Sequence, residues 1–361
     1  MKLQLLSAVR IVLVTFLFSA VFMFLMRKLA THIGAVDIPR SEEGNRHIHK
    51  KITPKMGGLG IFLAFLMGYM FFGEQSIRMN SILIGSFIIV LIGMFDDIKP
   101  IKNSYRFLVH IAAASVIVFY GGILLDNISA FGFSLNFGIL SYPITILFIV
   151  ACTDIIDLID GLDGLSGGIC SIFYLTIAII GLYQGRFGSL VMTLTLIMLG
   201  STLGFLLHNF HPAKIFAGDC VTFMGFIIGV ITLLEFKGPA LISFFVPVTI
   251  LGIPILDTFF AIIRRLLKGQ PPFQADKGHL HHQLLGMNFS QTVTVLIIYG
   301  IDLLFAAASI CFTIIDPVIG EIIYIIIFII VIWFVLHTSI ISEKNPKFTD
   351  KIKRKLRLKK K

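Results

Sequence analysis

The sequence predicts an all-α, polytopic integral membrane protein of about eleven transmembrane helices, with its N-terminus outside and its C-terminus in the cytoplasm. Of the 361 residues, 57% are hydrophobic and only 14% are charged, whereas soluble domains carry about 25% charged residues. The mean hydropathy is +0.94, and the apolar residues gather in stretches of about twenty, the length of a membrane-spanning helix. This composition excludes secreted disulfide scaffolds, disordered regulators and repeat solenoids.

The apolar segments follow one another along a single predicted transmembrane catalytic domain, residues 1–342, which ends in a basic cytoplasmic tail, residues 343–361. The first segment begins near Leu5; it is too long for a signal-peptide core and is expected to stay as an anchor. The eleven segments are 5–26, 57–73, 80–95, 105–122, 140–156, 164–183, 188–208, 219–235, 239–263, 291–313 and 318–341.

Lysine and arginine predict the orientation. The loops on the C-terminal side of the membrane hold 25 of the 30 basic residues, and such an excess is typical of cytoplasmic loops. Most of the net charge of +10 lies in the tail and in the loop 27–55. We therefore expect these basic residues to contact anionic lipids of the inner leaflet, and we expect no nucleic-acid partner.

Acidic residues within and beside the segments, most of them at the predicted cytoplasmic surface, indicate a reaction site. They are Asp96-Asp97, then Asp154, Asp157, Asp160 and Asp163, then Asp219, then Asp257, and finally Asp276 ahead of three histidines. Carboxylates with no compensating lysine or arginine repel one another, so this pattern predicts a hard divalent cation, Mg²⁺ or alternatively Mn²⁺. Acids at the inner interface favour an enzyme that joins a soluble substrate to a lipid. The alternative is a transporter of an anionic lipid or nucleotide sugar, which would place acids near the bilayer midplane.

The order of several motifs resembles the polyprenyl-phosphate N-acetylhexosamine-1-phosphate transferases, glycosyltransferase family 4. These motifs are Asp37-x-Pro39, Arg46-x-x-His49, Thr53-Pro54-Lys55-Met56-Gly57-Gly58, Asp96-Asp97, Asp160-Gly161-Leu162-Asp163-Gly164, Phe216-Ala217-Gly218-Asp219 and His279-Leu280-His281-His282. The histidine motif, with Arg264-Arg265 before it, is similar to the branch that transfers GlcNAc-1-phosphate and starts wall teichoic acid synthesis.

The resemblance implies a bacterial, multi-pass protein of the cytoplasmic membrane, with its active site on the cytoplasmic face. The reaction would transfer GlcNAc-1-phosphate from UDP-GlcNAc to undecaprenyl phosphate, giving undecaprenyl-diphosphate-GlcNAc and UMP. Another UDP-N-acetylhexosamine or UDP-MurNAc-pentapeptide is the alternative donor. Because the family includes dimers, a homodimer is compatible with the resemblance.

The resemblance also implies roles for particular residues. The catalytic acids would be Asp96, Asp97 and Asp219, and the metal ligands Asp219 and Asp160. Substrate would be bound by His49, Lys50, Lys55, Asp157, Asp160, Asp163, Phe216, Arg264, Arg265, His279, His281 and His282. The sequence departs from the family at Asp154 and Asp157, where Asn is usual, and two extra acids should recruit more cation or weaken nucleotide binding.

Overall fold

The computed structural model describes residues 2–38, 52–130, 133–235, 280–287 and 289–337. The chain divides into two compact units, Met1–Pro247 and Val248–Lys361. The elements of the first unit are α1 (Lys2–Ile33), β1 (Val36–Asp37), β2 (Thr53–Pro54), α2 (Gly57–Phe72), α3 (Ile77–Ile98), α4 (Asn103–Ser115), the π-helical turn η1 (Val116–Tyr120), β3 (Asn127–Ala130), β4 (Phe133–Asn136), the 3-10 turn η2 (Gly138–Leu140), α5 (Ser141–Ile159), α6 (Leu165–Tyr183), α7 (Leu190–Asn209), the 3-10 turn η3 (Asp219–Val221) and α8 (Thr222–Glu235).

Small residues bring the helices of the first unit together. On α7, a Cβ at Gly200 would lie 2.4 Å from the carbonyl oxygen of Val12, and one at Gly204 would lie 2.5 Å from that of Phe16. Only glycine allows this approach of α7 to α1, as is common between membrane helices. On α8, a Cβ at Gly225 would lie 2.4 Å from the carbonyl oxygen of Cys152 on α5. The packing of α1 on α7 and of α5 on α8 therefore rests on glycines.

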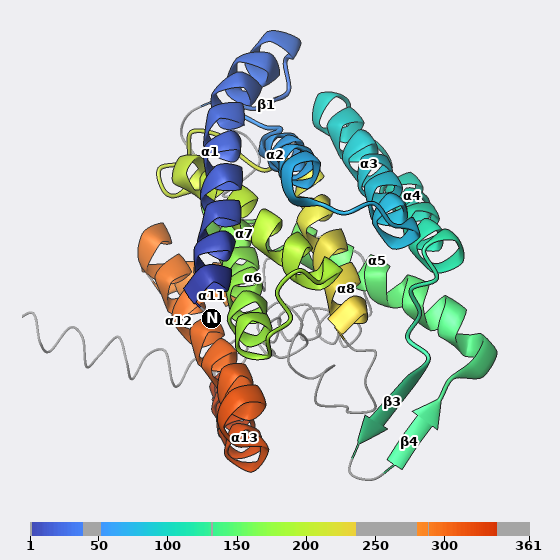
Figure 1. Ribbon diagram of the computed structural model, residues 1–361. Helices are drawn as coiled ribbons and strands as arrows, with labels where there is room; N and C mark the ends of the chain where they lie inside the picture. The colour runs from blue at the N-terminus through green and yellow to red at the C-terminus, as the bar shows by residue number, and fades with distance from the viewer. Residues whose placement is uncertain (1, 39–51, 131–132, 236–279, 288, 338–361) are drawn as a thin grey trace, which may run out of the picture. The chain divides into compact units, whose positions relative to one another are not determined.

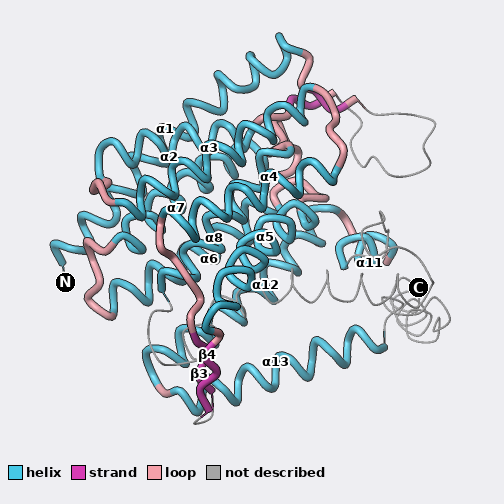
Figure 2. The backbone as a smooth tube through the Cα atoms, turned by 90° about the vertical axis from the view of Figure 1, so that its right-hand side faces the viewer, coloured by secondary structure: helices cyan, strands magenta, loops and turns pink. Residues whose placement is uncertain are grey.

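Helices α3, α4 and α5 pack side by side in chain order (Figure 1). Strands β3 and β4 form an antiparallel hairpin between α4 and α5. This hairpin lies at the opposite end of the unit from strands β1 and β2, which pair Val36 with Pro54 and Asp37 with Thr53 (Figures 1 and 2). The end near β1 and β2 also holds the C-terminus of α3, where Asp96 and Asp97 lie.

The second unit contains α11 (Leu280–Gly286), α12 (Gln291–Ile310), the π-helical turn η4 (Cys311–Ile315) and α13 (Pro317–His337) among its described residues. Ser290 caps the N-terminus of α12 by accepting a hydrogen bond from the N–H of Val293 at 3.3 Å. Helix α12 packs on α13, and the hydroxyls of Ser309 and Tyr324 lie 2.6 Å apart.

The described helices confirm a polytopic, mostly helical membrane protein. Six stretches are long and apolar enough to cross a membrane: Leu3–Ile33, Ile77–Ile98, Gly138–Ile159, Leu165–Tyr183, Leu190–Asn209 and Gln291–Ile315. Helix α2 and the stretch Val318–Ile330 of α13 are shorter apolar helices. The predicted segments 105–122 and 219–235 form α4 with η1 and η3 with α8, and segment 239–263 lies outside the described residues. The expectation of eleven spans stays a prediction.

Candidate active site

Two adjacent acids, Asp96 and Asp97, lie in the last turn of α3, beside the turn that carries Asp219. Asp96 and Asp97 are each 8% exposed. Asp96 Oδ1 accepts a hydrogen bond from the N–H of Ile101, and Asp97 Oδ1 accepts one from the N–H of Asp219 at 3.0 Å. Asp97 Oδ2 is buried without a hydrogen-bond partner among the described residues. The three acids that the resemblance assigns to catalysis therefore lie together.

Three glycines allow this turn to approach its neighbours. A Cβ at Gly93 of α3 would lie 2.8 Å from the backbone nitrogen of Cys220, and a Cβ at Gly58 of α2 would lie 2.5 Å from the carbonyl carbon of the same residue. Gly218 has a φ of +69°, and a Cβ there would lie 2.4 Å from either carboxylate oxygen of Asp97. Any larger residue at these three positions would push the turn away from α2 and α3.

The motif of residues 53–58, the first-loop motif, is joined to the same turn through backbone atoms. The N–H of Phe216 donates to the carbonyl oxygen of Pro54 at 2.9 Å. The N–H groups of Gly57 and Gly58 donate to the carbonyl oxygens of Phe216 and Ala217, both at 2.8 Å. Two motifs separated by about 160 residues in the sequence are thus paired much like strands. This places Lys55 near the acidic residues, and its ammonium interacts electrostatically with Asp97 and Asp219.

A single arginine lies at the centre of the acids. Arg106, in the first turn of α4, places Nη1 2.8 Å from Asp219 Oδ1 and 3.1 Å from Asp96 Oδ2, and Nη2 2.8 Å from Asp157 Oδ2. The side chain is 15% exposed. The expectation that the acids have no compensating lysine or arginine is therefore wrong, because Arg106 reaches into the cluster from an apolar segment.

A second pair joins the same two helices one turn further along. His110 Nδ1 lies 2.8 Å from Asp154 Oδ1, and the histidine is 3% exposed. Arg106 and His110 are four residues apart on α4, and Asp154 and Asp157 are three residues apart on α5, so each pair shares one helix face. Both acids that depart from the family pattern thus meet a basic side chain of α4.

The turn between α5 and α6 positions two further predicted residues. Asp160 accepts a hydrogen bond from Ser166 Oγ; burial raises the pKa of Asp160 to about 7, and the bond from Ser166 opposes part of this rise. Asp163, which is 7% exposed, has Oδ2 2.7 Å from His211 Nδ1 and accepts from the N–H of Ala213 at 3.1 Å. Asp163 therefore holds the loop that follows α7.

Asn209 ties this turn to the Asp219 loop. Its Oδ1 accepts from the N–H of Gly164 at 2.9 Å, and its Nδ2 donates to the carbonyl oxygen of Ile215 at 2.9 Å. The side chain is buried, with 2% exposed. Asn209 lies at the C-terminus of α7, so one amide side chain joins α6, α7 and the loop that leads to Phe216 and Asp219.

Several predicted site residues are not placed. His49, Lys50, Arg264, Arg265 and His279, together with Asp257 and Asp276, lie outside the described residues. His281 and His282 belong to α11 in the second unit. Their roles stay predictions.

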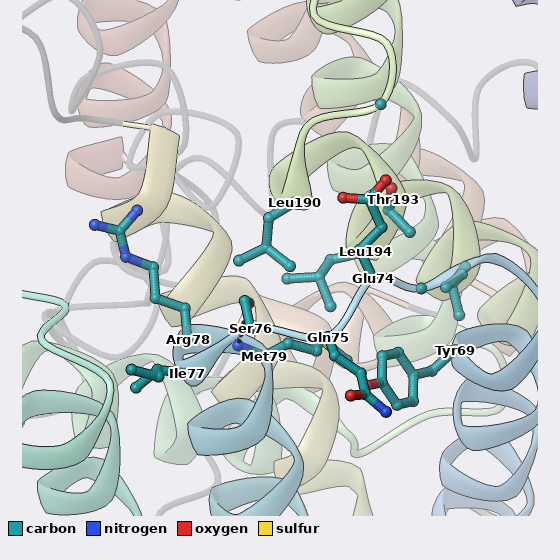
Figure 3. Close-up of a pocket in the computed structure, with 13 residues that line it drawn as sticks. Tyr69, Glu74, Gln75, Ser76, Ile77, Arg78, Met79, Leu190, Thr193 and Leu194 are labelled. Atoms are coloured by element: carbon teal, nitrogen blue, oxygen red, sulfur yellow. Dashed lines mark hydrogen bonds between the residues drawn. The ribbon is translucent and has the colours of Figure 1, made fainter.

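A cavity of about 410 Å³ lies at the other end of α3 (Figure 3). It is bordered by the α2–α3 connection, including Glu74, by Arg78 at the start of α3, and by the start of α7, including Leu190 and Thr193. Because a helix rises about 1.5 Å per residue, the two ends of the 22-residue α3 are about 30 Å apart. The cavity is therefore separate from the acidic residues.

The sequence reasoning missed three residues of the site: Arg106, His110 and Asn209. A signal was present for the first two, since a basic residue within or beside an apolar segment indicates a functional site. Their spacing of four residues, shortly after Asp96-Asp97, places them on one helix face. For Asn209 the sequence offers no comparable signal.

Comparison with known proteins agrees with the motifs. The family model described as "Glycosyl transferase family 4" matches residues 79–235. The chain is 39% identical over 337 residues to the "Probable undecaprenyl-phosphate N-acetylglucosaminyl 1-phosphate transferase" of Bacillus subtilis (strain 168), covering 91% of this chain and 92% of that protein. It is 33% identical over 322 residues to the "Decaprenyl-phosphate N-acetylglucosaminephosphotransferase" of Mycobacterium tuberculosis (strain ATCC 25618 / H37Rv), covering 80% of this chain and 78% of that protein. It is 31% identical over 325 residues to the "Undecaprenyl-phosphate alpha-N-acetylglucosaminyl 1-phosphate transferase" of Haemophilus influenzae, covering 87% of each.

Proposed function

Because this chain belongs to glycosyl transferase family 4, we propose that it transfers N-acetylglucosamine-1-phosphate from UDP-GlcNAc to undecaprenyl phosphate, giving undecaprenyl-diphosphate-GlcNAc and UMP. One observation carries the proposal: Asp96, Asp157 and Asp219 gather around Arg106 at one end of the helices, and Asp97 lies beside Asp219. The phosphoglycosyltransferase reaction requires a site at the ends of the membrane helices, where a lipid phosphate and a soluble nucleotide sugar can meet.

The proposed topology has eleven spans, an external N-terminus and a cytoplasmic C-terminus. The six candidate spans among the described residues and the distribution of lysine and arginine support it. In this topology the acidic residues face the cytoplasm, where UDP-sugars are found, and the tail 343–361 contacts anionic lipids of the inner leaflet.

The side chains of the described site residues have the chemistry that suits a magnesium ion. The cluster offers only carboxylate oxygens, its acids outnumber Arg106 and Lys55, and Asp97 Oδ2 has no hydrogen-bond partner among the described residues. No group of three His, Cys, Asp or Glu side chains that could hold a metal occurs in the described part of the chain. Following the resemblance, we assign the ion to Asp219 and Asp160, with the remaining ligands to be supplied by substrate oxygens and water. Mn²⁺ would fit the same oxygen donors.

In the proposed reaction, an oxygen of undecaprenyl phosphate attacks the β-phosphorus of UDP-GlcNAc. A new phosphorus–oxygen bond forms, the bond to the bridging oxygen breaks, and UMP leaves. The second pKa of a phosphate monoester is about 6, so the lipid phosphate is mostly ionised at pH 7 and needs little help from a base. The bound cation would neutralise charge on the diphosphate.

The chain's own residues then bind and orient the two substrates. His49, Lys50 and Lys55 would hold the lipid phosphate, with Asp96 and Asp97 facing it. Phe216 would stack on uracil, and Asp157, Asp160 and Asp163 would contact the nucleotide. Sugar and diphosphate would be bound by Arg264, Arg265, His279, His281 and His282. Positioning and neutralisation of charge are expected to supply most of the rate.

The test is release of UMP by the purified protein mixed with undecaprenyl phosphate, Mg²⁺ and one of three donors: UDP-GlcNAc, UDP-GalNAc or UDP-MurNAc-pentapeptide. We expect UDP-GlcNAc to react fastest. A faster reaction with another donor would change the assigned sugar, and no UMP with any donor would favour a transporter. Because the histidine motif with Arg264-Arg265 before it resembles the branch that starts wall teichoic acid synthesis, we further propose that the product starts a cell-envelope polymer of the wall teichoic acid class, tested by loss of that polymer when the chain is depleted.

A further inference from the structure

We propose that Arg106 is an internal counter-ion that occupies Asp219 in the metal-free protein and must release it before a divalent cation binds. The inference rests on the proposed role of Asp219 as a metal ligand. It concerns a residue to which the sequence assigned no role in the site.

The contacts of Arg106 are divided between its two terminal nitrogens. Nη2 is held by Asp157 at 2.8 Å, whereas Nη1 is shared between Asp219 at 2.8 Å and Asp96 at 3.1 Å. If Asp219 is withdrawn, two of the three ion pairs remain. Arg106 can therefore give up Asp219 without leaving the cluster, and Asp157, one of the two acids that replace the family's usual Asn, is the residue that retains it.

The position of Arg106 on α4 keeps its guanidinium within reach of the three acids with which it forms ion pairs. Helix α4 packs against both α3 and α5, and one turn beyond Arg106 the buried His110 pairs with Asp154 of α5 at 2.8 Å. The Arg106 side chain is 15% exposed, so little water competes for its guanidinium. A guanidinium keeps its charge at all physiological pH values, so it leaves a carboxylate only by displacement.

Displacement has a measurable consequence. A cation that binds Asp219 in the absence of nucleotide must break a charge-assisted hydrogen bond and then remain near the guanidinium charge. A diphosphate brings negative charge of its own, which allows the cation and Arg106 to be held together. Arg106 should therefore weaken cation binding to the substrate-free protein by about tenfold.

The experiment is a titration of the substrate-free, full-length protein in detergent with Mn²⁺, followed by electron paramagnetic resonance of the free ion. We expect Arg106→Gln to bind Mn²⁺ about tenfold more tightly than the wild type. The matched control is Lys55→Gln, which removes one positive charge that acts on Asp219 only electrostatically; it should tighten binding by no more than about threefold. Equal tightening in the two variants, or weaker binding in Arg106→Gln, would overturn the inference.

Arg106→Lys is a second test variant, included in case Arg106→Gln does not fold. Lysine keeps the charge but loses the planar fork that joins Asp157 and Asp219, so Mn²⁺ affinity should lie between those of the wild type and Arg106→Gln. If Arg106→Gln does not elute as a single species in size-exclusion chromatography, unchanged affinity in Arg106→Lys refutes the inference.

The titration also separates this inference from the proposed function. UMP release by the wild type together with unchanged affinity in Arg106→Gln would refute the counter-ion and leave the reaction standing. Tighter Mn²⁺ binding without any UMP release would refute the reaction and leave the counter-ion standing. Absence of Mn²⁺ binding in every variant would overturn the metal assignment and the inference together.

Discussion

Replacing Gly93 by alanine should separate α3 from the Asp219 turn and slow the reaction. The added methyl group would lie 2.8 Å from the backbone nitrogen of Cys220 and 2.9 Å from the carbonyl carbon of Asp219, whereas ordinary contact begins at 3.4 Å. Backbone atoms on both sides must therefore move by about 0.6 Å. If this movement separates Asp97 from Asp219, their 3.0 Å hydrogen bond lengthens to about 3.6 Å, beyond the range of a hydrogen bond.

The expected magnitude follows from this displacement. A shift of this size in a catalytic group costs about tenfold to a hundredfold in kcat. Overpacking should lower the free energy of unfolding by about 1–3 kcal/mol, partly offset by about 1 kcal/mol from the better helix propensity of alanine. The assays are UMP release at saturating substrates and thermal unfolding in detergent.

Gly300→Ala in α12 is the matched control, because a Cβ there meets no atom of the described residues within 4 Å. It should leave kcat unchanged and the melting temperature equal or higher. A Gly93→Ala variant with the kcat and melting temperature of the wild type would refute the claim that close packing positions Asp219.

Three further predictions test other parts of the site. Asp219→Asn should reduce the rate by about 10³-fold and by more than Asp96→Asn, because it removes the proposed cation's ligand; comparable rates of UMP release at saturating Mg²⁺ would contradict this ranking. Asn209→Ala should lower the free energy of unfolding by about 2–4 kcal/mol, since it removes both hydrogen bonds by which the buried amide joins the backbone of Gly164 and Ile215; chemical unfolding measures this, and a change below about 0.5 kcal/mol would count against the role of Asn209. Because the pKa of Asp160 is raised to about 7 from its ordinary value of 3.8, the folded state holds this proton longer than the unfolded state, so stability should fall as pH rises from about 4 to 7 in EDTA; Asp160→Asn should flatten that slope, and an unchanged slope would contradict the burial of the ionised group.

The sequence predicts the helices well where apolar stretches have clear ends. The segment 57–73 corresponds to α2, Gly57–Phe72, and the segment 164–183 to α6, Leu165–Tyr183. Glycines mark both starts, and hydropathy alone identifies the interior of each helix. The segment 105–122 differs, because α4 ends at Ser115 and continues as a π-helical turn. This change in backbone hydrogen bonding cannot be predicted from hydropathy.

The motifs also predict part of the site. Asp97 and Asp219 lie together as the resemblance implies, and the first-loop motif pairs with the segment before Asp219. The three ion pairs of Arg106 could not be predicted from the sequence, since they depend on how far α4 is rotated about its own axis. A rotation of 100°, which is one residue of an α-helix, would direct the guanidinium away from the acids. The number and order of charged residues in the sequence do not determine this rotation of α4.

The loop that carries Asp219 is joined to the first-loop motif by backbone atoms, and this matters for its chemistry. The N–H and C=O groups of Phe216 and the N–H groups of Gly57 and Gly58 take part in the hydrogen bonds that join it to the first-loop motif. These bonds do not involve the carboxylate of Asp219, whose oxygen contacts Arg106 instead. Exchange of that partner for a cation therefore removes no bond that positions the loop. Because glycines at the close approaches let backbone meet backbone, the carboxylate can change partners while the turn beneath it stays in place.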